Sequence, residues 1–236
     1  PESVKRKMSL SLSLAPFRWT ATDGLEYQVN LIDVPGYADF VGAAEAAMAV
    51  ADLAVLVVSA VDGVEVQTEM LWRRAVARGL PRMVFVTKED RERADFHRVL
   101  QQVQTMFGSG FAPLELPIGE AQSLHGIADV LSEQAFEYEP GGKHHVEPMP
   151  ADIADEEHRL HDSVVEEIVS GDDDQLERYL SGEVPSVADL ERTLAGATAA
   201  TTGGSMGSGS SSSVYSRRTG FSQPASTVSL TIGSSS

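Results

Sequence analysis

Cysteine is absent from the sequence, which excludes disulfides and thiolate metal sites and fits a cytoplasmic protein. No stretch approaches the ~20 apolar residues that a membrane span needs. The basic cluster at residues 5–7 is followed by no apolar signal-peptide region, so we expect no membrane association. The chain starts at Pro1 rather than at methionine, which predicts that the natural start lies elsewhere.

Basic residues are also scarce: 18 Lys and Arg stand against 35 Asp and Glu, a formal net charge of −17. Residues 141–200 alone carry 15 acidic and 4 basic side chains. Binding to phosphate backbones depends on a basic surface that displaces counterions. Non-specific nucleic-acid binding is therefore excluded, although a single local contact is not.

The first half of the chain has the pattern of an α/β protein. Short, continuous apolar runs at 29–32, 53–58 and 83–86 are typical of strands covered on both faces. Segments of helical composition at 38–50 and 65–78 separate them. Strands that alternate with helices in this way predict a parallel sheet.

The remaining segments differ in character. Strict alternation at 9–14 predicts a half-buried strand at a sheet edge. Residues 155–170 and 172–181 predict short acidic helices. Residues 201–236 contain 13 serines, 6 glycines and no acid, so they bury too little to offset the entropy of ordering, and we expect disorder.

The stretch Asp33-Val34-Pro35-Gly36, between a predicted strand and a predicted helix, is the most informative. A carboxylate at the end of a strand can reach a magnesium ion through water. A glycine beside it lets a backbone N–H approach a terminal phosphate. Loss of that phosphate would release the loop, which makes a switch. The alternative is a plain strand-ending turn, which Pro and Gly also favour.

A second loop, Thr87-Lys88-Glu89-Asp90, follows the run at 83–86. A carboxylate such as Asp90 can accept two hydrogen bonds from guanine, while the stem of Lys88 packs along the base. Alone, the loop would be interpreted as a charged strand-to-helix connection. Its spacing from the first motif favours a guanine site instead.

Residues 31–40, 51–66 and 83–96 together resemble elongation factor G and its actinobacterial elongation-factor-G-like relatives. That family has D-T-P-G-H-x-D-F at the switch and N-K-x-D at the guanine loop. Residues 146–194 resemble its acidic helical insertion, and the resemblance extends from about Arg6 to Ala197. It implies an α/β fold of the P-loop NTPase type with a mostly parallel sheet.

The resemblance divides the chain into three parts: a partial GTP-binding domain at 1–140, an acidic helical insertion at 141–197 and a disordered Ser/Gly-rich tail at 198–236. It also assigns roles to residues. The nucleotide-binding residues would be Asp33, Pro35, Gly36, Thr87, Lys88 and Asp90, with GTP or GDP and Mg²⁺ as cofactors. Asp33 would face the magnesium, and Ser9 would supply a coordinating hydroxyl.

Several departures from the family pattern bear on activity. No G-x-x-x-x-G-K-[ST] occurs in the sequence, so we expect the first strand and the phosphate-binding P-loop to be missing from the fold. Tyr37 stands where the family has the histidine that positions the attacking water, and a phenol is a poor base at neutral pH. Thr87 replaces the family's asparagine.

These features predict a translational GTPase fragment, related by descent to GTP hydrolysis on the ribosome but without turnover as this chain. The alternatives are a non-enzymatic module, whose acidic helices bind a basic partner such as a ribosomal stalk protein, and a non-functional remnant. His144, His145, His158 and His161 could suggest a metal site, but solvated histidines are the favoured interpretation. Residues 172–174 lack the spacing of a calcium loop and predict a helix start.

Overall fold

The computed structural model describes residues 11–20, 24, 26–108, 111–139, 143–200, 212–214 and 226–234. Its strands are β1 (Ser13–Thr20), β2 (Glu26–Pro35), β3 (Leu53–Ser59), β4 (Arg82–Thr87), β5 (Phe111–Pro113), β6 (Glu115–Ile118), β7 (Gly126–Asp129), β8 (Gln134–Tyr138), β9 (His144–Glu147), β10 (Ser212–Val214) and β11 (Ser226–Ser234). Its helices are α2 (Val41–Met48), α3 (Val66–Ala77), α4 (Phe96–Phe107), α5 (Ala154–Val169), α6 (Asp173–Leu180) and α7 (Val187–Ala200), with 3₁₀ turns η1 (Ala38–Phe40) and η2 (Ala121–Ser123). The strands and helices predicted between residues 29 and 86, and both acidic helices, are confirmed.

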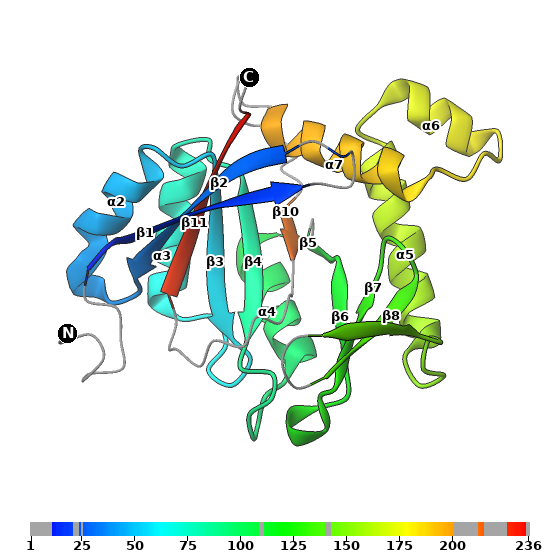
Figure 1. Ribbon diagram of the computed structural model, residues 1–236, viewed down its shortest axis with the longest axis horizontal. Coiled ribbons are helices and arrows are strands. Elements are labelled where there is room, and N and C mark those ends of the chain that lie inside the picture. The colour runs from blue at the N-terminus through cyan, green and yellow to red at the C-terminus, as the bar shows by residue number, and fades with distance from the viewer. Residues whose placement is uncertain are drawn as a thin grey trace.

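Two sheets lie next to each other (Figure 1). The larger has the order β1-β2-β11-β3-β4-β10-β5, and the smaller has the order β6-β7-β8-β9. In the larger sheet β3, β4, β10 and β5 are mutually parallel, and β2 runs the same way because β11 is antiparallel to both β2 and β3. The smaller sheet is antiparallel throughout, and α5 lies beside it in Figure 1.

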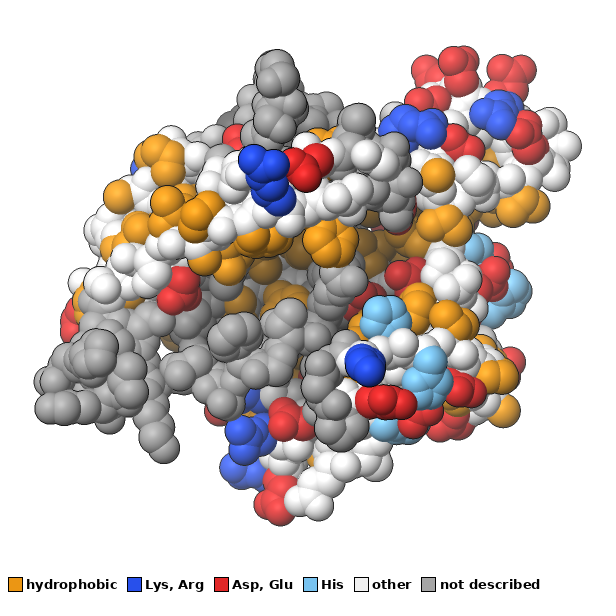
Figure 2. Space-filling model, in the orientation of Figure 1, with side chains coloured by type: hydrophobic (Ala, Val, Ile, Leu, Met, Phe, Trp, Pro, Cys, Tyr) orange, Lys and Arg blue, Asp and Glu red, His pale blue; other side chains and the backbone are white. Residues whose placement is uncertain are grey.

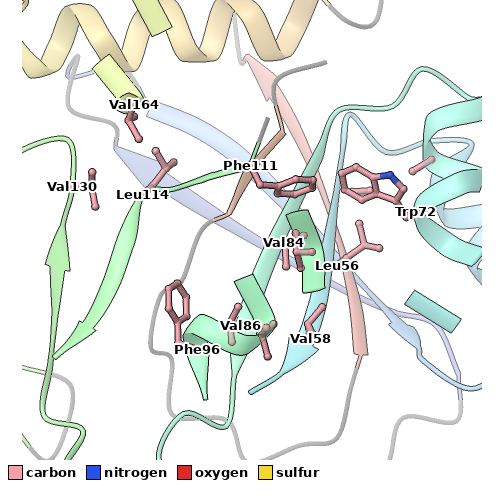
Figure 3. Close-up of a cluster of buried hydrophobic side chains, with 14 of the residues drawn as sticks. Leu56, Val58, Trp72, Val84, Val86, Phe96, Phe111, Leu114, Val130 and Val164 are labelled. Carbon is pink, nitrogen blue, oxygen red and sulfur yellow. The ribbon is translucent and has the colours of Figure 1, made fainter. Parts of the chain in front are cut away.

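The main core lies between the larger sheet and the helices behind it in Figure 1. Leu56 and Val58 of β3 and Val84 of β4 are almost fully buried, as continuous β-branched runs require. Figure 3 shows them beside Trp72 of α3, whose ring stacks on Phe107 at a centroid distance of 4.5 Å. Trp72 is 6% exposed and belongs to this core.

Strand β1 forms one edge of the larger sheet, as predicted for an edge strand, but it is not half-buried. Every residue of β1 is exposed, and Leu14, Phe17 and Trp19 are 60%, 44% and 49% exposed. Figure 2 shows hydrophobic side chains along this edge. Alternation fixes which residues share a face, but it cannot say whether another element covers that face. The first two residues of the predicted strand, 9 and 10, lie outside the described residues.

The serine-rich tail contains two strands where the sequence predicts disorder. β11 lies between β2 and β3, and β10 lies between β4 and β5. Ladder hydrogen bonds join backbone groups, so a segment with few apolar side chains can still pair with open strand edges. Composition alone misses this contribution.

The limits of the predicted insertion do not coincide with elements of the structure. β9 starts beyond residue 140 yet pairs with β8, and α7 runs to Ala200. The division at 140 and 197 stays a prediction. Among the described residues, no helix is both long and apolar enough to cross a membrane.

Two arginines at the end of α3, Arg74 within the helix and Arg78 directly after it, form ion pairs with α2. Arg74 and Arg78 both contact the carboxylate of Glu45 on α2, and the Nη2 of Arg78 lies 2.5 Å from Oε2. Hydrogen bonds from Arg78 and then Arg74 hold the pKa of Glu45 below its ordinary value. This carboxylate therefore ties α2 to α3.

Glu45→Gln is expected to lower the free energy of unfolding by about 1 kcal/mol at pH 7, a figure reduced for the partial exposure of the three side chains. Because the folded pKa is lowered, the stabilisation is present above the ordinary value of 4.5 and is lost as the pH falls through the lowered pKa. Urea unfolding of both proteins at pH 7 and at acid pH measures this. Glu69→Gln is the control, since its partner Arg73 is 76% exposed. A difference from wild type that persists undiminished in acid would contradict the assignment.

Candidate functional site

The candidate site lies at the carboxyl ends of β2, β3 and β4. Ser59 ends β3 and pairs in register with Thr87, which ends β4. β2 ends at Pro35 and runs in the same direction, so both predicted nucleotide loops leave the sheet at one edge. Ligands of open α/β sheets bind outside this edge, because the connecting loops there are free to vary.

Hydrogen bonds with two side chains without a predicted role hold the loop after β3 in place. The Oγ of Ser59 accepts hydrogen bonds from the backbone N–H groups of Val61 and Asp62, both at 3.2 Å. Arg98 of α4 donates to the carbonyls of Ala60 and Val61 at 2.9 and 2.8 Å. These contacts hold the turn that presents Asp62. Residues 59–63 lie within the segment 51–66 that resembles the family, but the resemblance assigned no role to any of them.

The side chain of Lys88 connects the loop after β4 to the loop after β3. Its Nζ lies 3.2 Å from Oδ2 of Asp62, and its side chain is 28% exposed. Hydrogen bonds from Ser59 and then Lys88 hold the pKa of Asp62 below its usual range. Lys88 has a φ of 61°, in the left-handed region, which turns the chain sharply after β4. The ion pair fixes the position of the Lys88 Nζ.

Asp90 lies in the turn that Lys88 begins. The backbone N–H of Arg91 donates to the carbonyl of Lys88 at 3.1 Å, and the Asp90 carboxylate is 51% exposed. Its nearest described cation is Arg91, whose Nε lies 4.0 Å from Oδ2. A carboxylate held this loosely can accept hydrogen bonds from a ligand at the edge.

The other predicted loop starts deeper in the sheet. Asp33 is partly buried in β2 and pairs with Val228 of β11, which pairs with Val55 of β3, and Val55 pairs with Met83 of β4. Asp33 thus lies level with Met83, below the end of β4. Beyond β2, Gly36 is partly exposed and Tyr37 is 49% exposed. Ser9, the other predicted magnesium ligand, lies outside the described residues.

The Asp33–Gly36 loop and the Thr87–Asp90 loop lie at the same edge of the sheet but not next to each other. β2 and β4 are separated by β11 and β3, which is three inter-strand spacings, or roughly 14 Å. A ligand that used both loops would have to lie across the ends of β11 and β3. One end of it would meet Asp90 and Lys88, and the other would meet the Asp33–Gly36 turn.

Of the two strands between the loops, β11 runs the wrong way to carry a phosphate-binding loop. β11 is antiparallel to both β2 and β3, so it enters the sheet at the carboxyl edge and leaves at the opposite edge. A P-loop follows the carboxyl end of a strand that is parallel to its neighbours, where backbone N–H groups and a lysine surround the phosphates. β11 cannot deliver such a loop at this edge.

Together, the parallel strands, the helices between them and the loops at their carboxyl edge define an α/β fold of the P-loop NTPase type, incomplete in its phosphate-binding part. A family model described as the elongation factor Tu GTP binding domain matches residues 2–215. The chain belongs to this family, and within it is an elongation factor G-like G domain.

The relatives support this assignment. Elongation factor G 2 of Pseudoalteromonas translucida (strain TAC 125) is 37% identical over 172 residues, covering 72% of this chain and 25% of that protein. Elongation factor G of Mycoplasma pneumoniae (strain ATCC 29342 / M129 / Subtype 1) is 36% identical over 168 residues, covering 70% and 24%. The chain thus spans about a quarter of the length of these relatives.

A solved structure agrees with the sequence relatives. The crystal structure of a protein from Thermus thermophilus superposes with a TM-score of 0.76 at 32% identity, covering 92% of this chain and 30% of that one. The predicted elongation factor G-like family and the predicted P-loop NTPase-type fold are therefore confirmed.

Proposed function

We propose that this chain is the guanine-reading and switch part of an elongation factor G-like GTPase, and that on its own it binds GTP and GDP weakly and does not hydrolyse GTP. The parent reaction would be GTP hydrolysis coupled to translocation on the ribosome. Thr87, Lys88 and Asp90 would hold guanine, while Asp33, Pro35 and Gly36 would form the loop that senses the γ-phosphate. Tyr37 could orient water but is a poor base.

The observation that carries this proposal is the common edge of the two loops in a chain of this family. Asp90 is exposed at the end of β4, and the Lys88–Asp62 ion pair fixes the turn that presents it. Neither loop supplies a cradle of N–H groups and lysine for the β- and γ-phosphates, and the sequence has no P-loop motif. Since such contacts supply most of the electrostatic hold on a nucleotide, we expect binding to rest on the base.

Magnesium fits this site only together with a nucleotide. Asp33 supplies one partly buried carboxylate at the end of β2. Mg²⁺ keeps several waters and is usually held by one or two carboxylates plus the phosphates of its substrate. Asp33 would therefore face the ion, directly or through water, once phosphates are present. When bound, the ion would neutralise charge on the phosphates.

Titration of a fluorescent GDP with Mg²⁺ tests the proposal. We expect weak binding that guanine nucleotides compete for and adenine nucleotides do not. Asp90→Ala should remove this selectivity, because it removes the acceptor for the guanine N–H groups. Glu92→Ala is the matched control, since it removes an exposed acid from the same loop without touching the base. Binding that ignores Asp90→Ala, or that accepts adenine equally, would contradict the proposed role.

A second candidate function rests on charge. Residues 141–200 carry 15 acids and 4 bases, and α6 starts with an acidic turn capped by Asp172, whose carboxylate accepts from the N–H of Gln175 at 3.0 Å. Such a surface suits a basic protein partner, for example a ribosomal stalk protein. Complete absence of guanine-selective binding by a folded chain would favour this non-enzymatic role, or a remnant without function.

A further inference from the structure

A cluster of potential metal ligands lies where the smaller sheet meets α5, away from the nucleotide edge. Glu157 and His161 are one turn apart on α5, and Glu133 lies in the turn between β7 and β8. One ligand atom from each of the three lies within 4.8 Å of the others. Glu133 has a φ of 53°, in the left-handed region, so the turn adopts a costly conformation at the residue that faces α5.

Glu157 is the most informative member of this cluster. It is 3% exposed, and its Oε1 is buried without a hydrogen-bond partner among the described residues. Burial, and then the charge of Glu133, raise the pKa of Glu157 above its ordinary value. A buried carboxylate oxygen without a partner destabilises the folded protein unless a cation or hydrogen bonds compensate it. Buried groups of this kind are commonly paired or bound to a metal.

His161 is oriented as metal-binding histidines are. Its Nδ1 lies 2.7 Å from the carbonyl of Val130, which fixes this nitrogen as the N–H donor and leaves the lone pair on Nε2. Nε2 lies 3.9 Å from Oε2 of Glu133. The ring is 17% exposed, so it is held in place by its surroundings rather than free in solvent. A backbone carbonyl behind the ring also raises its strength as a ligand.

We propose that Glu133, Glu157 and His161 form a binding site for a divalent transition-metal cation such as Zn²⁺, with a water completing the coordination. Two carboxylates and a neutral imidazole balance the charge of the ion. In a tetrahedral zinc site with ligand bonds of ~2.0–2.1 Å, neighbouring ligand atoms are about 3.4 Å apart. The 3.9 Å between His161 and Glu133 needs only a small closure, which the exposed side chain of Glu133 can supply.

A metal here would join the turn between β7 and β8 to α5. Glu133 otherwise contacts His158, whose Nδ1 lies 3.2 Å from Oε1, so one carboxylate oxygen has a protein partner while the other faces His161. The expected role is to hold the smaller sheet against the helix. The nearby group of Glu137, His145 and Glu147 provides a contrast, because its members are exposed or half-exposed.

The test is zinc binding by the full 236-residue chain after metal removal, with a chromophoric chelator as competitor and thermal unfolding as a second readout. We expect one equivalent of zinc to bind and to raise the melting temperature, with at least tenfold weaker binding in His161→Ala and Glu133→Gln. His145→Ala is the matched control and should bind as wild type does. Mg²⁺ should give no stabilisation, since it favours oxygen ligands.

Glu157→Gln separates metal binding from folding. Without zinc it should melt at or above the temperature of the wild type, because it removes a buried carboxylate charge, whose Oε1 has no hydrogen-bond partner among the described residues, while keeping the side chain's shape. With zinc it should show no further rise. The proposal is overturned if zinc stabilises Glu157→Gln as much as wild type, if His145→Ala rather than His161→Ala removes binding, or if wild type binds no zinc.

Discussion

Ser229→Pro is expected to lower the free energy of unfolding by about 3 kcal/mol, a large share of the ~5–15 kcal/mol that keeps a domain folded. Ser229 of β11 pairs with Ile32 of β2 on one side and with Ala54 of β3 on the other. Whichever neighbour its N–H faces, that group lies inside the sheet. Proline removes this donor, leaves an acceptor unsatisfied and does not fit the middle of a sheet.

The melting temperature reports this effect, and a loss of about 3 kcal/mol corresponds to roughly 6–12 °C for a chain of this size. Ser234→Pro is the matched control: the same chemical change falls at the end of β11, where the strand pairs with β2 alone. It should cost much less. Equal melting temperatures for wild type and Ser229→Pro would show that the tail does not complete the sheet in solution.

The second large effect is expected from supplying the phosphate-binding part. In a chimera, residues 226–236 are deleted and a strand, a G-x-x-x-x-G-K-S loop and the following helix are joined ahead of Pro1, so that a parallel strand can take the place of β11. Several charge-assisted contacts to phosphate, each contributing ~1.5–3 kcal/mol, should raise the affinity for GDP by about a thousandfold or more.

The chimera has two controls. Replacing the loop lysine by alanine should remove most of the gain, because that lysine reaches the β- and γ-phosphates. Asp90→Ala in the chimera should remove the preference for guanine but leave the phosphate contacts. A folded chimera that binds GDP no better than the unmodified chain would mean that the Asp33 and Asp90 loops do not form a nucleotide site.

How far the sequence predicted the fold depended on whether the signal was local. The runs of β3 and β4 are continuous and rich in β-branched residues, which predicts strands covered on both faces of a parallel sheet. In the structure, buried and partly exposed residues alternate along both strands. The alternation of β1 predicted an edge strand but not its exposure, since exposure depends on what lies above it. β11 was missed because its pairing is made by the backbone and joins segments at opposite ends of the chain.

The same distinction applies to the sites. Asp33, Gly36, Lys88 and Asp90 stand in short motifs with recognisable spacing, so the sequence could indicate them. The ion pair between Lys88 and Asp62 and the burial of Glu157 depend on which loops and helices meet in space. For that reason His161 was interpreted as a solvated histidine, although it is only 17% exposed and hydrogen-bonded to Val130.

The orientation of β11 is what connects fold to activity in this account. The loops proposed to read the base and to sense the terminal phosphate are both at the carboxyl edge, and β11, one of the two strands between them, runs antiparallel. On the proposed function, the chain would keep the two ends of a nucleotide site without the middle that holds the β-phosphate. We therefore expect binding energy to come mainly from the base, with little stabilisation of the charge that develops during phosphoryl transfer.

Single-turnover GTP hydrolysis, measured with Mg²⁺ and with and without ribosomes for the unmodified chain beside the chimera, tests this claim most directly. The account predicts no hydrolysis above background by the unmodified chain in either condition, while the chimera retains bound guanine nucleotide through purification. Ribosome-stimulated hydrolysis by the unmodified, homogeneous chain would contradict it.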